Sequence, residues 1–233
     1  AVEAFVAGGF LGATRDHEQG GLQLPHLITQ ACFAHFQSAN VGTANYPFLA
    51  IGVAGLIDSF GSPEQKRLFL QPLLEGRYFG SMSMTEPDAG SALTELTSSA
   101  TPQPDGSYLI RGCKTFISAG DHPLGENILH MVLARLPDAP AGAHGISLFI
   151  VPKFLVSADG SRGPSNGVTL RALLHKMGWR GSTTATLGFG DQAPCTGYLL
   201  GQPNQGLSYM FQMMNEARIG TGMGATMLGY AGY

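Results

Sequence analysis

The sequence predicts an α+β chain: an amino-terminal helical domain, then a β-barrel or sandwich, then the first helix of a truncated carboxy-terminal helical bundle. Three observations predict this order. Apolar residues repeat at helical spacing before Gly76, short β-rich runs separated by turn residues fill Tyr78 to about Leu200, and helical spacing returns at Leu207. The predicted domains are residues 1–77, 78–203 and 204–233.

The first part predicts three helices. Apolar positions recur at helical spacing from Leu24 to Phe36, and a second apolar run covers Pro47 to Phe60. The third begins at Ser62–Gln65, which supplies a capping serine, a proline at the first helical position and a glutamine three residues after the cap. This helix is expected to stop at Gly76.

The middle part predicts strands. Pro104-Asp105-Gly106 directly before Tyr108 is a hairpin signal. Because no helices separate the strands, a sandwich or barrel is favoured over a parallel βαβ sheet. The other strand candidates are 128–136, 146–151, 168–174 and 183–189.

The last part predicts one long helix, in which Met210, Met213 and Met214 are at core spacing. Gly220–Ala225 fits a dinucleotide-binding pattern of glycines, but it follows a helical run instead of a strand. Those small residues are therefore expected to permit close helix packing. No stop signal follows Tyr233, so the natural chain is expected to continue.

Composition narrows the function classes. Charged residues make up only 12% of the 233, about half of the usual share, which predicts that a partner subunit, another domain or a large ligand covers surface. A homo-oligomer is therefore expected. No apolar run reaches the roughly 18 residues of a membrane-spanning helix. The net charge of −3 does not indicate binding to nucleic acid, which needs a basic surface. The three dispersed cysteines predict no disulfide framework and a reducing, cytoplasmic location.

Two segments carry chemistry. Met84–Ser91 reads as a strand end followed by a tight turn, with a glycine where backbone must approach something closely. Lys114–Gly120 reads as a strand whose Phe116 and Ser118 face the same side and could offer a stacking surface and a hydrogen bond to a flat ring. A plain turn and core packing of Phe116 are the alternative interpretations.

Together these segments resemble the acyl-CoA dehydrogenase family, which has a T-E-P-x-A-G-S turn followed by an aromatic-Ile-Thr/Ser strand. The resemblance runs from about Gly12 to Tyr233, and residues 120–154 are similar to the branch that contains 3-methylmercaptopropionyl-CoA dehydrogenases. Four further segments match in family order: Leu73–Gly76, Lys176–Ser182, Leu200–Gly206 and Met214–Arg218.

The resemblance implies FAD as cofactor, an acyl-CoA substrate, and an electron-transfer flavoprotein or similar acceptor. A carboxylate would take the α-proton and the flavin N5 would take the hydride. Ser91, Asn215 and Arg218 would contact the acyl-CoA, and no metal site is implied. The residues that would bind FAD are Met82, Met84, Thr85, Gly90, Ser91, Phe116, Ile117 and Ser118.

The sequence departs from the family pattern at the catalytic base. Most members carry the catalytic glutamate in the carboxy-terminal domain, so the base is expected beyond Tyr233 and residues 1–233 alone are expected to be inactive. Some branches carry it at the position of Ala217, and Glu216 is rotated about 100° from there. Glu216 is therefore interpreted as a solvated or structural carboxylate. An acyl-CoA oxidase and a non-catalytic flavin- or acyl-CoA-binding module remain alternatives.

Overall fold

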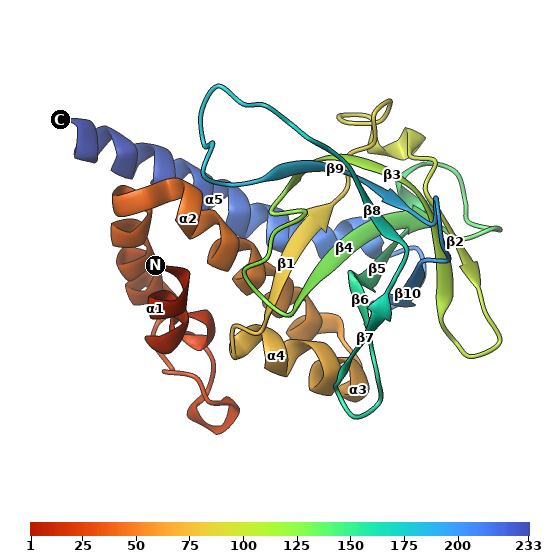
Figure 1. Cartoon of the computed structure of the whole chain (residues 1–233), viewed down its shortest axis with the longest axis horizontal. Helices are drawn as coiled ribbons and strands as arrows, with labels where there is room; N and C mark the ends of the chain where they lie inside the picture. Colours follow the sequence, from red (N-terminus) through yellow and green to blue (C-terminus); the bar gives the residue numbers. More distant parts are fainter.

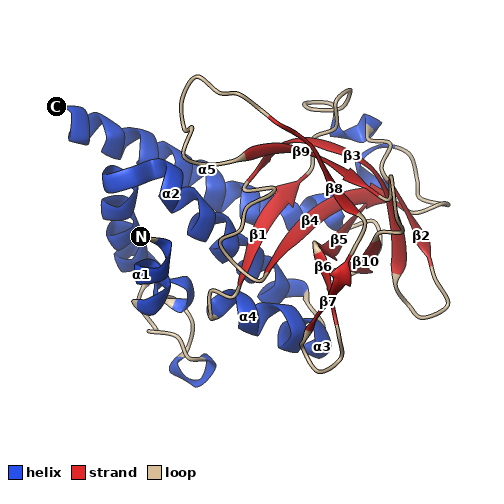
Figure 2. Cartoon of the chain, in the orientation of Figure 1, coloured by secondary structure: helices blue, strands red, loops and turns tan.

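The computed structural model describes residues 1–233, apart from the side chain of Gln19. Helices gather at one end of the molecule and strands at the other, while α5 runs back along α2 (Figures 1 and 2). The helices are α1 (Val2–Ala7), α2 (His26–Phe60), α3 (Pro63–Gln65), α4 (Gln71–Leu74) and α5 (Gly206–Gly232). The strands are β1 (Tyr78–Ser83), β2 (Ser99–Pro102), β3 (Tyr108–Ser118), β4 (Asn127–Arg135), β5 (Ile146–Pro152), β6 (Phe154–Val156), β7 (Arg162–Ser165), β8 (Val168–Leu173), β9 (Thr184–Phe189) and β10 (Thr196–Leu199).

Helix α2 corrects one prediction. The runs expected as two helices form one long element, interrupted at Asn40, whose φ of −163° and ψ of 94° are not helical. The Asn40 side chain accepts a 2.9 Å hydrogen bond from the Thr43 backbone N–H, as an N-cap does at a helix start. The kink is therefore a capped restart of the helix, and it lies seven residues before the predicted start at Pro47.

The predicted capping box at Ser62 is confirmed. The Gln65 backbone N–H donates to Ser62 Oγ at 3.1 Å, and the Ser62 backbone N–H donates to Gln65 Oε1 at 3.0 Å. The helical segment that begins there continues through a π-helical turn at Lys66–Leu70 into α4. It ends before Gly76, which has a φ of +70° that favours glycine.

Five strands, β2, β3, β4, β5 and β10, form a closed ring, so the predicted barrel or sandwich is a barrel, while β6 and β7 form a separate two-stranded sheet. In the eight-stranded sheet the order is β1-β4-β5-β10-β3-β9-β8, and β2 pairs with both β3 and β4. The connections β4-β5-β10-β3-β2-β4 therefore return to their starting strand. The predicted hairpin at Pro104–Gly106 joins β2 to β3, with Pro102 opposite Tyr108.

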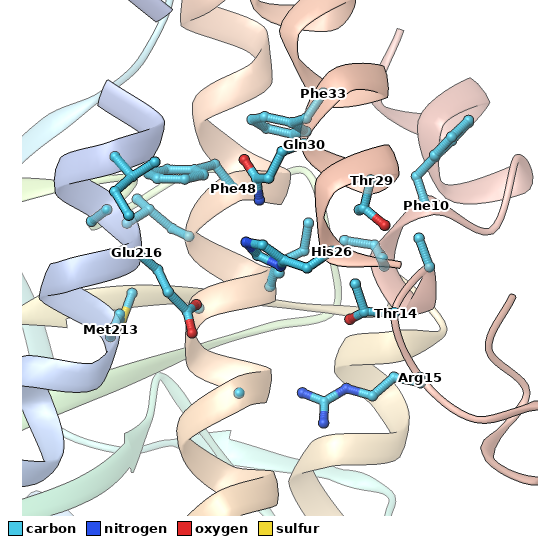
Figure 3. Close-up of a pocket in the computed structure, with 18 of the residues that line it drawn as sticks. Phe10, Thr14, Arg15, His26, Thr29, Gln30, Phe33, Phe48, Met213 and Glu216 are labelled. Atoms are coloured by element: carbon cyan, nitrogen blue, oxygen red, sulfur yellow. The ribbon is translucent and has the colours of Figure 1, made fainter. Parts of the chain in front are cut away.

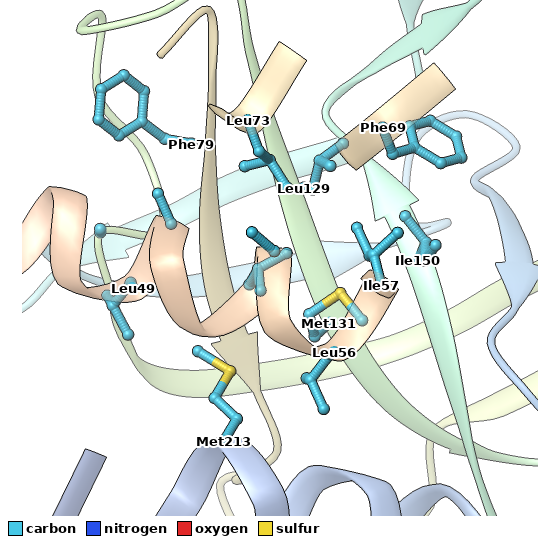
Figure 4. Close-up of a cluster of buried hydrophobic side chains, with 14 of the residues drawn as sticks. Leu49, Leu56, Ile57, Phe69, Leu73, Phe79, Leu129, Met131, Ile150 and Met213 are labelled. Atoms are coloured by element: carbon cyan, nitrogen blue, oxygen red, sulfur yellow. The ribbon is translucent and has the colours of Figure 1, made fainter. Parts of the chain in front are cut away.

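Strands β4 and β5 are buried on both faces, because helices cover one side and the barrel interior the other. Alternate side chains such as Leu129 and Met131 pack against the helices, while Val132 and Phe149 pack inside the barrel. Figure 4 shows Leu49, Leu56 and Ile57 of α2 meeting strand residues and Met213 of α5. One hydrophobic cluster thus joins the amino-terminal helices, the sheet and α5.

Helices α2 and α5 pack closely through small residues. A Cβ added at Gly220 would lie 2.5 Å from a carbon of the Phe48 ring. The glycine pattern at Gly220–Ala225 therefore serves helix packing, as expected, and lies wholly within α5. Met210 and Met213 are buried in the shared hydrophobic cluster and Met214 packs against it, which confirms the methionines as core residues.

Candidate functional site

The turn after β1 is held by two backbone hydrogen bonds between Glu86 and Ala89, of 3.0 and 3.2 Å. Met82 and Met84 are half-buried and pack against the cluster between the sheet and the helices. Thr85, just before the turn, is half-buried. Gly90 and Ser91, just after it, are exposed. The segment thus runs from the core to the surface within a few residues.

Phe116 lies on a β-bulge. The pairing of β3 with β9 shifts register between Lys114 and Ile117, so one extra residue is accommodated on β3. Phe116 adopts a φ of +58°, which is rare for an aromatic residue, and its side chain is 68% exposed. Core packing of Phe116 is therefore excluded. Ile117 is buried inside the barrel, and Ser118 is half-buried at the end of the strand.

The turn and the bulge form one surface, although 30 residues separate them. The Thr115 backbone N–H donates a 2.8 Å hydrogen bond to the Thr85 carbonyl oxygen. The Lys114 ammonium donates to the Met84 carbonyl oxygen at 3.0 Å and to Glu86 Oε1 at 2.9 Å. Residues 82–91 and 114–118 are thus brought together, as a shared binding site requires.

Glu86 remains charged despite its burial. Desolvation would raise the pKa of this carboxyl, but the Lys114 charge and hydrogen bonds from Thr97 and Ser98 outweigh it and lower the pKa to about 2. Burial lowers the pKa of Lys114, and the attraction of Glu86 opposes that shift. The one sequence signal for this pair is a lysine inside a strand with core residues around it, at a position where a charge is rare.

Asn215 and Arg218 form a second patch on α5. Both are exposed, and Arg218 Nη1 donates a 2.9 Å hydrogen bond to Asn215 Oδ1. Among the described side chains, neither residue makes a hydrogen bond to residues 82–91 or 116–118. The structure therefore brings the expected FAD residues together and leaves these two expected substrate residues on a separate element.

A cavity of about 260 Å³ lies between α2, α5 and the segment after α1. Phe33 and Phe48 line its apolar part, while Arg15, His26 and Glu216 face it from different elements (Figure 3). Sequence reasoning missed this cavity, because its walls come from both ends of the chain and only the tertiary structure brings Phe33 and Glu216 to one space.

Glu216 is a cavity residue. Its carboxylate extends from α5 into the space beside His26 and Arg15 (Figure 3). Desolvation raises the pKa of Glu216, and the nearby His26 and Arg15 partly offset that rise. Glu216 is nevertheless an exposed residue, so it contacts solvent as well as the cavity.

Metal ligands and membrane-spanning helices are two further features. Across residues 1–233, with the Gln19 side chain left aside, no three His, Cys, Asp or Glu residues gather as metal ligands would. In the same described range, none of the helices combines the length and apolar character needed to cross a membrane. Cys195 is a free thiol, and burial raises its pKa to about 12.

Comparison with protein families gives two matches. Residues 1–77 match the acyl-CoA dehydrogenase N-terminal domain, and residues 81–192 match the acyl-CoA dehydrogenase middle domain. The chain is 43% identical over 223 residues to a 3-methylmercaptopropionyl-CoA dehydrogenase of Ruegeria pomeroyi, which covers 96% of this chain and 37% of that protein. It is 38% identical to a broad-specificity linear acyl-CoA dehydrogenase of Mycobacterium tuberculosis, over 100% of this chain and 38% of that one.

Two solved structures have a fold similar to that of this chain over almost its whole length. Butyryl-CoA dehydrogenase of Megasphaera elsdenii superposes with a TM-score of 0.82 at 25% identity, covering 99% of this chain and 57% of that one. A chain from a study of the electron transferring flavoprotein of Acidaminococcus fermentans gives 0.82 at 26% identity, with the same coverage. The chain thus spans little more than a third of the length of those two curated relatives.

Proposed function

We propose that this chain, which belongs to the acyl-CoA dehydrogenase family, is part of an FAD-dependent enzyme that oxidises an acyl-CoA thioester between its α and β carbons. The observation that carries the proposal is the joined surface of the turn at Thr85 and the bulge at Phe116. It presents an exposed aromatic ring on a strand whose backbone is hydrogen-bonded to the Thr85 turn, and it coincides with the two family motifs.

The residues present fit a flavin. A flat ring system needs a stacking face, which the 68% exposed Phe116 supplies, and hydrogen-bonding groups at its edge, which Thr85 and Ser118 supply. Ser91 and Gly90 are exposed on the same turn, where a larger ligand can approach the backbone. When bound, FAD supplies the hydride acceptor, which no amino-acid side chain can replace.

We place the acyl chain in the cavity between α2 and α5. Its aromatic walls suit an acyl chain, and α5 also carries Asn215 and Arg218, which we assign to the CoA portion. The Arg218 guanidinium is exposed and suited to a phosphate or carbonyl oxygen. The acyl chain would then lie among the helices, since all residues that line this cavity belong to residues 5–59 and to α5.

The α-proton must go to a carboxylate, and we place that base outside residues 1–233. Ala217 occupies the position at which some family branches carry the base, and its methyl group cannot accept a proton. Glu216 lines the cavity, but it is rotated about 100° around α5 from Ala217. We assign Glu216 to the wall of the cavity.

The proposed flavin chemistry also requires an electron acceptor. An electron-transfer flavoprotein or a similar acceptor would reoxidise the flavin, and the low charge content of the chain supports a homo-oligomer in the cytoplasm. The structural similarity to a chain from a study of such a flavoprotein supports the acceptor.

The test is the visible spectrum of the full-length protein containing this chain, recorded without oxygen before and after adding butyryl-CoA or a long-chain acyl-CoA. Oxidised flavin bands that bleach with a thioester are the expected result. Bands that never bleach would indicate a binding module, and rapid reoxidation by air would indicate an oxidase. A folded protein without flavin would overturn the assignment, and Phe116→Ala should lower the flavin content relative to a matched surface change, Phe211→Ala.

A further inference from the structure

The Lys114–Glu86 ion pair lies directly beneath both segments of the proposed FAD surface, and the chemistry above does not use it. Both side chains are buried, Lys114 at 0% exposure and Glu86 at 5%. Ion pairs buried to this degree are costly to desolvate and are weak evidence for stability by themselves. Its position therefore suggests a role beyond holding the fold together.

Both members of the pair make further hydrogen bonds. Glu86 Oε2 accepts from the Thr97 backbone N–H at 2.7 Å and from the Thr97 hydroxyl at 2.8 Å, and Oε1 accepts from the Ser98 backbone N–H at 2.9 Å. The Lys114 ammonium also donates to the carbonyl oxygen of Met84. One ion pair thus fixes the end of β1, the turn and the loop before β2 against β3.

Lys114 is also the last residue of β3 in regular register before the bulge. It pairs with Leu187 of β9, and pairing resumes at Ile117 with Ala185. Between them Phe116 holds a left-handed backbone conformation, which is strained for a residue with a side chain and persists only where neighbouring contacts impose it. The Lys114 contacts and the Thr115 bond to Thr85 are the contacts that link this bulge to the turn.

We propose that Lys114 and Glu86 are positioning residues, which fix the exposed Phe116 ring relative to Thr85 and thereby set the affinity and the electronic environment of the bound flavin. This inference rests on the function proposed above. The alternative is that the pair contributes only to folding, as a buried structural ion pair would.

The experiment uses the full-length enzyme and a Lys114→Met/Glu86→Leu double variant, which removes both charges together. The variant also leaves the Thr97 and Ser98 backbone N–H groups and the Met84 carbonyl oxygen without partners, so the melting temperature should fall, and FAD binding is measured well below it. The dissociation constant for FAD, measured by titrating apoprotein, should rise about ten-fold or more, since charge-assisted contacts no longer hold the turn. The midpoint potential and visible band shape of the remaining bound flavin should also change.

The control is Arg77→Met/Glu126→Gln, which removes an exposed ion pair of 2.9 Å at the opposite end of β1. This control should keep the parent's FAD affinity, potential and spectrum. A double variant at Lys114 and Glu86 that keeps all three would overturn the positioning role and leave the proposed function intact. A parent that binds no FAD would overturn both.

Glu86→Gln is the second variant, in case the double variant does not fold. It keeps the size of the side chain but replaces the charge that holds Lys114. The folded variant should bind FAD about three-fold or more weakly, because hydrogen bonds to a neutral acceptor are weaker than those to a carboxylate. Unchanged FAD affinity and band shape in this variant would equally overturn the inference.

Discussion

The side-chain amide of Gln37 donates a 3.0 Å hydrogen bond to the backbone carbonyl oxygen of Gly220, 183 residues away and buried between α2 and α5. At the same point the Phe48 ring occupies the space that a side chain at residue 220 would need. The two helices can therefore approach only because residue 220 is glycine, and the cavity assigned to the acyl chain lies along this contact.

Gly220→Ala should destabilise the protein by about 1–3 kcal/mol, because the added methyl group would overlap the Phe48 ring. Gly222→Ala is the matched control on the same helix, where no atom lies within 4 Å of the added Cβ. The control should instead stabilise α5 by about 0.5–1 kcal/mol. Urea unfolding of both variants checks the difference, and equal stabilities would contradict the close packing.

Phe116→Gly should make the apoprotein more stable by about 1 kcal/mol, because glycine adopts a positive φ without steric cost. The same change should weaken FAD binding, since the stacking face is lost. Phe116→Trp should retain FAD, because a larger ring keeps that face. Melting curves of the apoproteins and FAD titrations give the two readouts. A Gly variant that binds FAD as tightly as the parent would argue against stacking.

As the pH falls below 6.5, protonation of two buried histidines should destabilise the folded protein. Burial lowers the pKa of His130 to about 3 and of His122 to about 4, below the ordinary value near 6.5. Because the folded pKa values are depressed, this stability is complete above pH 6.5 and is lost as the pH falls toward 4. For His130, whose Nδ1 lies 2.7 Å from Ser81 Oγ, the loss should be about 2–3 kcal/mol between pH 6.5 and 4.5.

A Ser81→Ala/His130→Leu variant should show a smaller loss over that pH range, because both polar partners are removed together. The exposed His144→Gln change is the control and should leave the pH profile unchanged. Melting temperatures between pH 7 and 4.5 provide the measurement. A double variant with the parent's pH profile would exclude His130 as a source of acid sensitivity.

Glu216→Gln should leave kcat within about three-fold of the parent, because we place the base elsewhere. General-base catalysis contributes roughly 10²–10⁴-fold, so a loss in that range would identify Glu216 as the base instead. Glu64→Gln on the exposed face of α3 is the matched control. Steady-state kinetics with one saturating acyl-CoA decides between the two roles.

Several features of the fold could be read from local sequence. The capping box at Ser62, the hairpin at Pro104–Gly106 and the methionine face of α5 depend on residues within a few positions of one another, and all three were predicted correctly. The kink at Asn40 was missed because an asparagine between two apolar helical runs does not distinguish a capped restart from a loop.

What the sequence determined by itself was the order of helices and strands, the family, and the two motifs at Thr85 and Phe116, because each is encoded by neighbouring residues. The tertiary structure decided what surrounds them. The bulge that exposes Phe116, the Lys114–Glu86 pair beneath it and the cavity that Glu216 faces all arise from segments far apart in the chain. Burial and register are properties of the packed strands and helices, so no local pattern could specify them.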